Sequence, residues 1–441
     1  MKTSQSQSNN QLIIIGSGPV GMVAALMLKP YFKNIIIFER QSKEKFLNKY
    51  GFTFPIVLAP AAIKILEMIN VWDDIMTERS EYFGIVIHVN ALGQDLNLTI
   101  TQDDAYSHWR NHIVTSLYER VVAEEIPIVF ESNVTSIDFD NNICTEASQG
   151  QLSFDLLIGS DGINSFTRKQ LAQAHPDYAE DEFALTLLDY WHAYRLPSTG
   201  RLKEKYDGGE KSHASNVYIS NPPQSPNEKM RIVTTCMQQP EEEISILIKY
   251  DLDVPHERAK AVNEQFFSEY MDSVETVNEE WELGVTGKFE QVKAPTYYYK
   301  SVLLLGDSAH GFESTGDLIN IGITSVEAFV NLFLQKPTLS QALQEYDQKI
   351  GENIRYYTKY AYRRNREKIS AEVSMFMVAE QLGLVTKHPG MFGMFAEDFE
   401  LQKGIETYKR DVKTINMLMI GVPILLLLIG FLRFIFRPRG D

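Results

Sequence analysis

A glycine-rich turn near the start of the chain has the spacing needed to bind a dinucleotide. The apolar run Leu12–Ile15 predicts a buried strand, and Gly16-Ser17-Gly18-Pro19-Val20-Gly21 follows it, ahead of the apolar helix pattern Met22–Leu28. In a G-x-G-x-x-G turn the glycines permit a tight bend, close approach of a pyrophosphate and packing of helix on strand. A second apolar run, Ile35–Phe38, ends in Glu39-Arg40, where an acid can bind ribose hydroxyls. The pattern predicts a site for FAD or NAD and does not distinguish the two.

A later segment, Leu303–Gly322, has a composition suited to holding a charged ring system. Its sequence LLLGDSAHGFESTGDLINIG predicts a buried strand, a turn at Gly306-Asp307, a glycine-bearing loop and the start of a helix. Apolar residues then recur at the i, i+3, i+4, i+7 spacing of a helix with one buried face (Val326, Phe329, Val330 and Phe333). A helix N-terminus offers unpaired N–H groups and partial positive charge, which would stabilise an anion such as reduced flavin.

This segment resembles the second flavin motif of the class A FAD-dependent monooxygenases, the para-hydroxybenzoate hydroxylase family. The resemblance implies that FAD is the cofactor, that Asp307 holds its ribityl chain and that Gly316–Gly322 faces the isoalloxazine ring. The loop departs from the family pattern at Leu318, which replaces a glycine, and at Ser314, which replaces a proline. Asp317 places a carboxylate near the ring, which would lower the reduction potential of the flavin.

Two further segments match the same family in the same order. Arg110 begins an apolar-periodic stretch similar to the family's R-x-x-L helix, whose arginine contacts the FAD phosphates. The segment Asp155–Arg168 is similar to a strand followed by an Asp-Gly pair, here Asp161-Gly162, that lies near the pyrophosphate and is linked to use of NAD(P)H. The residues expected to bind the cofactor are Gly16, Gly18, Pro19, Val20, Gly21, Glu39, Arg40, Arg110, Asp161, Gly306, Asp307, Gly316, Leu318, Ile319 and Asn320.

Composition narrows the class of protein. The 441 residues suit two interlocked domains with appendages, and a formal charge of −16 argues against nucleic acid as a partner. Cys144 and Cys236 lie far apart, so no disulfide framework is expected and a reducing compartment is favoured. His108 and His112 are four residues apart but have no acidic third ligand nearby in sequence. We therefore expect them to be helix-surface or packing histidines and expect no metal site.

The overall pattern predicts an α/β fold in which a Rossmann-like FAD-binding domain interlocks with an antiparallel-sheet substrate domain. Alternating apolar residues in Ile85–Val89 and Ile244–Tyr250 predict the antiparallel strands. A helical region and a C-terminal transmembrane helix are expected to follow. The expected boundaries are 1–10 for a disordered lead-in, 11–81, 102–183 and 293–350 for the FAD-binding domain, 82–101 and 184–292 for the substrate domain, 351–414 for the helical region and 415–436 for the transmembrane helix.

The C-terminal segment predicts a single-pass membrane anchor. Met417–Leu432 carries no charge, and with its flanks it reaches the roughly 20 residues that span a bilayer. Basic residues lie on both sides of it, so their distribution does not set the orientation. A need for FAD and reduced nicotinamide would place the catalytic body in the cytoplasm. A buried helix or a hydrophobic docking segment is the alternative interpretation of this stretch.

The resemblance implies an NAD(P)H-dependent monooxygenase that hydroxylates or epoxidises a hydrophobic or aromatic small molecule through a flavin C4a-hydroperoxide, and it identifies no catalytic side chain. The membrane-anchored layout resembles the kynurenine 3-monooxygenase branch of the family. Ile85 and Leu98 stand about where that branch has an arginine–tyrosine carboxylate clamp, which favours a lipophilic ring as substrate. Three alternatives remain open: a membrane-bound flavin reductase or dehydrogenase, such as a prenyl-chain reductase, an NAD-only dehydrogenase, and a membrane-tethered flavoprotein without turnover.

Overall fold

The computed structural model describes most of the first 355 residues. The described residues are 10–48, 55–91, 94–197, 214–220, 232–239, 243–268, 274–312 and 317–355, with Thr358, Arg410, Lys413, Thr414 and Met417. The predicted transmembrane helix, apart from Met417, and nearly all of the predicted helical region, 351–414, lie outside them. The predicted domain boundaries remain predictions.

A six-stranded, mostly parallel sheet carries the glycine turn. Its strand order is β16-β17-β10-β1-β2-β6, and only the β16–β17 pair is antiparallel. Four of the five residues of β1 are buried, as expected for a parallel strand covered on both faces. The strands are β1 (Gln11–Ile15), β2 (Asn34–Phe38), β6 (Ile128–Val129), β10 (Leu156–Gly159), β16 (Tyr298–Tyr299) and β17 (Val302–Leu304).

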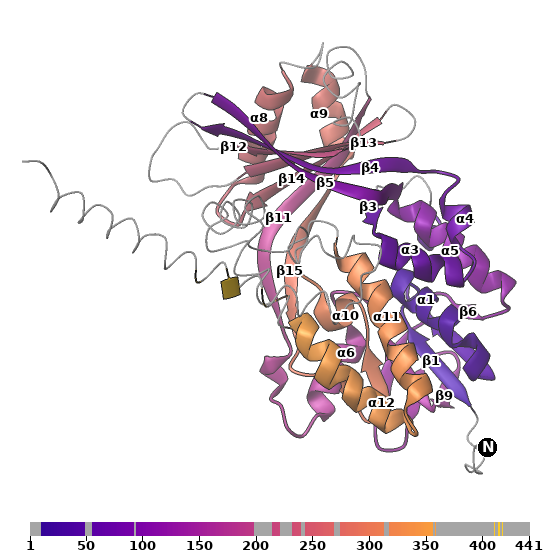
Figure 1. Cartoon of the computed structure of the whole chain (residues 1–441). Helices are drawn as coiled ribbons and strands as arrows, with labels where there is room; N and C mark the ends of the chain where they lie inside the picture. The colour runs from indigo at the N-terminus through magenta and orange to yellow at the C-terminus, as the bar shows by residue number, and fades with distance from the viewer. Residues whose placement is uncertain are drawn as a thin grey trace, which may run out of the picture.

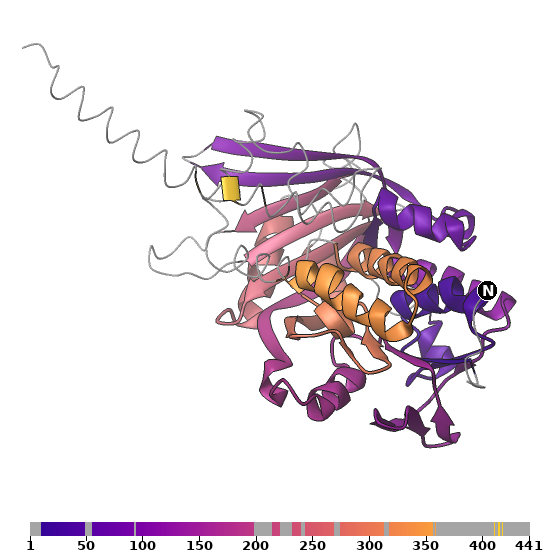
Figure 2. The same cartoon turned by 60° about the horizontal axis from the view of Figure 1, so that its bottom comes forward.

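Helices from both ends of the described chain pack together on this sheet. Figures 1 and 2 both show α11 and α12, in orange, beside the indigo and purple helices of the N-terminal part, and α1 and α11 are in contact. The helices are α1 (Pro19–Leu28), α2 (Lys43–Phe46), α3 (Pro60–Met68), α4 (Trp72–Ile75), α5 (Arg110–Ala123), α6 (Phe166–Ala174), α10 (Asp307–His310), α11 (Asp317–Gln335) and α12 (Leu339–Glu345), with short helices at Lys29–Tyr31, Glu180–Glu182 and Tyr346–Gly351.

Helix α11 confirms the periodicity predicted for it. Val326, Phe329 and Val330 are buried in the main core, and Phe333 packs against the same core. Its segment Leu318–Gln335 is long and apolar enough to cross a membrane by length and composition, yet half of that window is buried inside the protein. Because its apolar face packs against the sheet and its neighbouring helices, α11 is a core helix of the fold.

The prediction of a wholly antiparallel second sheet was wrong. The order of this eight-stranded sheet is β15-β11-β14-β13-β12-β4-β5-β3, and the β12–β4 pair is parallel, so the sheet is mixed and not wholly antiparallel. A parallel pair needs a long crossover connection, and residues 92–213 supply it. The strands are β3 (Pro55–Leu58), β4 (Ser80–Ala91), β5 (Gln94–Trp109), β11 (Ala184–Pro197), β12 (Ala214–Ser220), β13 (Ile232–Gln239), β14 (Glu243–Asp251) and β15 (Val285–Lys293); a separate small sheet contains β7 (Val134–Asp138), β8 (Ile143–Glu146) and β9 (Gly150–Ser153).

The two faces of the eight-stranded sheet meet different neighbours. Helices α8 (His256–Phe267) and α9 (Val274–Leu283) cover the upper face in Figure 1, where the even-numbered residues of β14 form a core with them. Because side chains alternate along a strand, the odd-numbered residues of β11, β13 and β14, with Val217 of β12, face the other way. We call these side chains the inner face. Val217 and Met237 of the inner face pack against Val57 and Ala59, which adjoin α11.

Candidate functional site

The glycine turn leaves the start of α1 open to a ligand. Gly16 has φ +99°, and a Cβ there would lie 2.5 Å from the carbonyl oxygen of Ser160. At Gly21, a Cβ would lie 2.2 Å from the carbonyl oxygen of Gly16. Gly18 is different, because a Cβ on it would meet nothing within 4 Å. Gly18 is also the N-cap of α1, with Pro19 next, so an anion can reach the helix N-terminus there.

Glu39 closes the turn from the end of β2. Its buried carboxylate accepts hydrogen bonds from the Ser17 backbone N–H (3.1 Å), the Ser17 hydroxyl (2.7 Å) and the Gln41 N–H (2.9 Å). A carboxylate offers about four acceptor positions, so it retains capacity for a ribose hydroxyl. Arg40 lies beside it in a surface hollow of about 500 Å³ that is lined by Arg40, Gln41, Ser42, Lys45 and Glu131.

Three of the predicted cofactor residues come together although they are far apart in sequence. Arg110 is the first residue of α5, and it interacts electrostatically with Asp307 and Glu39. Burial among protein atoms lowers the pKa of Arg110, and the two carboxylates oppose that shift. Burial likewise raises the pKa of Asp307, and Arg110 opposes it. Both side chains nevertheless remain exposed to solvent, so we infer that they line a concave surface.

The second glycine motif packs directly on the first. Gly306 has φ +68°, and a Cβ there would lie 3.0 Å from Cγ2 of Val20; at Gly322 in α11 the same distance would be 2.6 Å. These two glycines therefore let β17 and α11 approach the first turn of α1. Leu318 and Ile319 are half-buried against the main core, and Gly316 lies outside the described residues.

Asn320 uses its side chain to fasten α11 to β3. Its Oδ1 accepts a hydrogen bond from the backbone N–H of Ala59 (2.8 Å), and its Nδ2 donates to the carbonyl oxygen of Val57 (2.9 Å). The side chain is buried. The structure thus gives the Asn320 side chain a positioning role, and its predicted contact with the cofactor remains a prediction.

The loop that follows β10 is tied to the Gly306-Asp307 turn. The Asp161 carboxylate accepts the backbone N–H of Thr167 at 2.9 Å and so holds the loop in shape. Arg168 is buried, and its guanidinium donates to the carbonyl oxygens of Ser308 (2.8 Å) and Ile163 (2.7 Å). The predicted segment therefore contributes a structural brace, and the contact of Asp161 with the cofactor remains a prediction.

Sequence reasoning missed the serines that lock these turns together. The Ser160 hydroxyl lies 3.0 Å from the Gly16 carbonyl oxygen, and the Ser308 hydroxyl donates to the Gly159 carbonyl oxygen at 2.6 Å. Ser17 binds Glu39 as described above. Each serine stands within two residues of a glycine of a predicted turn, and that proximity was the available signal.

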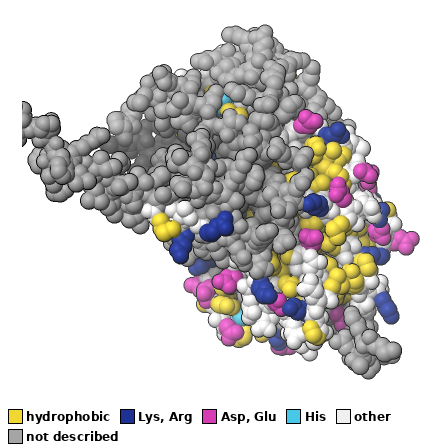
Figure 3. Space-filling model, in the orientation of Figure 1, with side chains coloured by type: hydrophobic (Ala, Val, Ile, Leu, Met, Phe, Trp, Pro, Cys, Tyr) yellow, Lys and Arg dark blue, Asp and Glu magenta, His cyan; other side chains and the backbone are white. Residues whose placement is uncertain are grey.

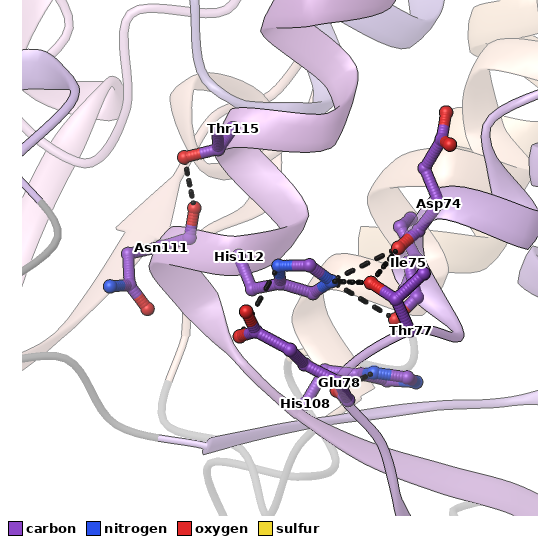
Figure 4. Close-up of polar contacts among 8 residues, drawn as sticks. All are labelled: Asp74, Ile75, Thr77, Glu78, His108, Asn111, His112 and Thr115. Atoms are coloured by element: carbon purple, nitrogen blue, oxygen red, sulfur yellow. Dashed lines mark hydrogen bonds and ion pairs between the residues drawn. The ribbon is translucent and has the colours of Figure 1, made fainter.

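His108 and His112 attach the end of β5 and the start of α5 to the end of α4 and the segment that follows it (Figure 4). Nε2 of His112 lies 3.2 and 3.1 Å from the carbonyl oxygens of Asp74 and Ile75, and its Nδ1 lies 3.4 Å from Oε2 of Glu78. Nδ1 of His108 lies 3.0 Å from the Glu78 carbonyl oxygen, and burial lowers the pKa of His108 to about 4. Both rings therefore act as packing histidines. Within the described part of the chain, no group of three His, Cys, Asp or Glu residues is arranged to hold a metal ion.

Surface charge on the described residues of one face is mixed. Figure 3 shows Lys and Arg side chains interspersed with Asp and Glu, with apolar side chains between them. The visible described residues thus form no basic stripe of the kind that tracks a nucleic-acid backbone.

A mostly parallel sheet with a glycine turn, an acid at the end of the second strand and a second glycine-aspartate turn defines a nucleotide-binding α/β protein. The chain belongs to the FAD binding domain family, whose sequence model matches residues 9–330. FAD is therefore its cofactor.

Similar proteins confirm the resemblance to FAD monooxygenases. Kynurenine 3-monooxygenase of Phaeosphaeria nodorum is 24% identical over 216 residues, which is 43% of this chain and 43% of that protein. The chain therefore matches less than half the length of this relative. The fold resembles the tetrameric form of 2-methyl-3-hydroxypyridine-5-carboxylic acid oxygenase (TM-score 0.65, 17% identity, 81% of this chain and 92% of that chain). It also resembles PqsL of P. aeruginosa in complex with 2-aminobenzoylacetate (TM-score 0.60, 14% identity, 81% and 96%).

Proposed function

We propose that this protein is an NAD(P)H-dependent FAD monooxygenase that hydroxylates or epoxidises a hydrophobic or aromatic small molecule. One observation carries the proposal: Arg110, the first residue of α5, interacts electrostatically with both Asp307 and Glu39, which come from two other elements, and the start of α1 is open to a ligand. An acid, a cation and a second acid in that arrangement match the ribose, the phosphates and the ribityl chain of FAD.

The described residues support a site for the adenosine, pyrophosphate and ribityl parts of FAD. The hollow at Arg40 would take the adenosine end, with Glu39 on the ribose. The backbone at Gly18 and the Arg110 guanidinium would hold the pyrophosphate, because both are open to solvent and carry positive charge or free donors. Asp307 would accept hydroxyls of the ribityl chain, which would leave the isoalloxazine ring near the start of α11.

When bound, FAD supplies the transfer of electrons from reduced nicotinamide to oxygen. The protein supplies position and exclusion of water, and the inner face of the eight-stranded sheet is suited to both. Half-buried Val217, Met237 and Leu247 give this face an apolar surface opposite α11. The names of the relatives, which include kynurenine, a hydroxypyridine carboxylic acid and 2-aminobenzoylacetate, support a ring-bearing small molecule as substrate.

A flavin reductase or dehydrogenase without oxygen transfer is the second candidate. Leu318 in the first turn of α11 favours it, because its half-buried side chain stands where the family pattern has a glycine. A side chain at this position keeps the protein backbone farther from the flavin ring than a glycine would. Oxygen consumption coupled to substrate separates the two candidates.

A membrane anchor at residues 415–436, with the catalytic body facing the cytoplasm, is part of the same proposal. Its support is the uncharged apolar run of the sequence and the basic residues that flank it. Removal of Met417–Asp441 is expected to release the protein from membranes in a flotation assay. A truncated protein that still floats with vesicles would show that another segment binds the bilayer.

The proposed activity is tested on the full chain purified in detergent. We expect flavin absorbance in the visible region, restored by added FAD if it is lost in purification. NADPH and oxygen consumption are then measured over a panel of phenols, quinols and prenylated rings. Oxygen uptake that forms hydroxylated or epoxidised product supports the monooxygenase, whereas reduced product without oxygen uptake supports the reductase.

A further inference from the structure

The inner face carries two described cations, Lys249 and Arg195, and their surroundings differ. Half-buried Val217, Met237 and Leu247 give this face an apolar centre. Lys249 is largely buried and makes an ion pair with Asp189 at 3.0 Å, so its charge is already neutralised. Arg195, near the end of β11, is the other described cation of this face, and its side chain is 29% exposed.

Arg195 is held in place by an aromatic ring. The centre of its guanidinium lies 3.9 Å from the ring centroid of Trp109, a cation–π contact across the inner face from β11 to β5. A cation–π contact of this kind does not use the guanidinium N–H groups as donors to oxygen atoms, so they can still donate to an anion. Among the described residues, its one hydrogen-bond partner is Glu243, at a long 3.2 Å between Nη1 and Oε2.

Trp109 connects Arg195 to the cofactor site. It is the N-cap residue of α5, and Arg110 follows it directly. Arg110 interacts with Asp307 and Glu39 on the cofactor side, while the indole of Trp109 lies under Arg195 on the substrate side. The N–H groups of Arg195 that make no hydrogen bond within the described part of the chain therefore lie at the edge of an apolar surface, close to the predicted flavin site.

We propose that Arg195 is the substrate-binding residue that selects a planar aromatic molecule with an acidic substituent, a carboxylate or phenolate. The inference rests on the proposed function and deepens it. The apolar centre of the inner face contacts the ring, and the guanidinium donates two parallel N–H groups to the anionic oxygens. Glu243 holds the guanidinium through one hydrogen bond when no substrate is bound, and the substrate anion displaces that contact.

The test uses the FAD-loaded full chain in detergent and two probes of equal shape, 2-naphthoate and 2-naphthamide. Binding is followed by perturbation of the flavin absorbance. The variants are Arg195→Gln and Glu243→Gln. Arg120→Gln is a matched control, because Arg120 and Glu124 form a surface pair with side-chain exposures of 31% and 34%, against 29% and 33% for Arg195 and Glu243.

The two variants are expected to act in opposite directions. Arg195→Gln removes a charge-assisted contact and should weaken 2-naphthoate by about tenfold or more, with 2-naphthamide unchanged. Glu243→Gln removes the internal competitor and should strengthen 2-naphthoate by about two- to fivefold, the range of a partly exposed ion pair. Arg120→Gln should leave both affinities unchanged.

Other outcomes overturn the proposal. They are failure of 2-naphthoate to bind the wild-type protein, equal effects on both probes, and weaker 2-naphthoate binding in Glu243→Gln. If Arg195→Gln does not fold, the proposal is tested by whether Glu243→Gln strengthens or weakens the binding of 2-naphthoate. A protein that takes up no FAD at all would refute the proposed function instead, and this is seen before any probe is added.

Discussion

Replacement of Asn320 by alanine tests whether one side chain sets the position of α11. Asn320 joins the first turn of α11 to the end of β3 through two hydrogen bonds of 2.8 and 2.9 Å to the backbone of Ala59 and Val57. The side chain is only 1% exposed, so water does not replace the lost contacts without cost. In the alanine variant, the N–H of Ala59 and the carbonyl of Val57 lose these partners.

The expected magnitude follows from those two contacts. A hydrogen bond contributes about 1 kcal/mol net, and a buried backbone group left without a partner costs about 1–3 kcal/mol. Partial relaxation of the first turn of α11 reduces the sum, so we expect a loss of about 2–4 kcal/mol in the free energy of unfolding. The start of α11 also lies where the flavin ring is proposed to sit, so FAD affinity should fall with it.

The assay is urea unfolding of the protein with and without FAD, with FAD affinity measured by fluorescence titration. Thr324→Val is the control, because the Thr324 hydroxyl donates to the Asn320 carbonyl within the same helix and does not join α11 to β3. It should cost no more than about 1 kcal/mol and leave FAD affinity intact. If Asn320→Ala costs no more than this control, the fastening of α11 by Asn320 is refuted.

Four further substitutions give distinct expectations. Gly16→Ala places a Cβ against backbone at φ +99° and should cost at least about 2 kcal/mol in urea unfolding, whereas Gly18→Ala meets open space and should keep stability within about 0.5 kcal/mol while it weakens FAD about tenfold in titrations. Arg168→Met removes two hydrogen bonds to backbone carbonyls and should cost about 2–4 kcal/mol in the same assay; an unchanged midpoint would show that the brace is dispensable. Burial lowers the pKa of His310 to about 4, so the unfolded chain binds the extra proton below pH 6.5, and stability should fall by about 1.4 kcal/mol per pH unit from pH 6.5 towards 4. His310→Phe should remove that part of the slope, as measured by urea midpoints at pH 7 and 5.

Local motifs of the cofactor site could be predicted because each depends on neighbours in sequence. The bend at Gly16, the acid at Glu39 and the turn at Gly306 follow from a strand that ends in glycine and from a fixed spacing to the next element. The helix after the second turn could likewise be predicted from its apolar period. Predicting these features requires no information about residues that are distant in sequence.

Long-range contacts could not be predicted in the same way. The partners of Asn320 lie some 260 residues away, in β3 and directly after it, and those of Arg168 include Ser308 in α10. The parallel pairing of β12 with β4 also left no trace in the alternation of apolar residues, because a strand shows the same period in either direction. Such contacts depend on which helices and strands pack against one another. A single sequence does not reveal that packing.

The start of α5 shows how the cofactor and substrate sides share one short segment. The N-cap of α5 is Trp109, which makes no side-chain cap, although Ser, Thr, Asp or Asn there would stabilise the helix by about 1 kcal/mol. An indole at that position instead stacks with Arg195 of the inner face, while the next residue, Arg110, turns towards Asp307 and Glu39. Because the two side chains leave adjacent Cα atoms, any shift of α5 moves both. A substrate anion that pulls on Arg195 would therefore act, through Trp109, on the residue proposed to hold the FAD phosphates.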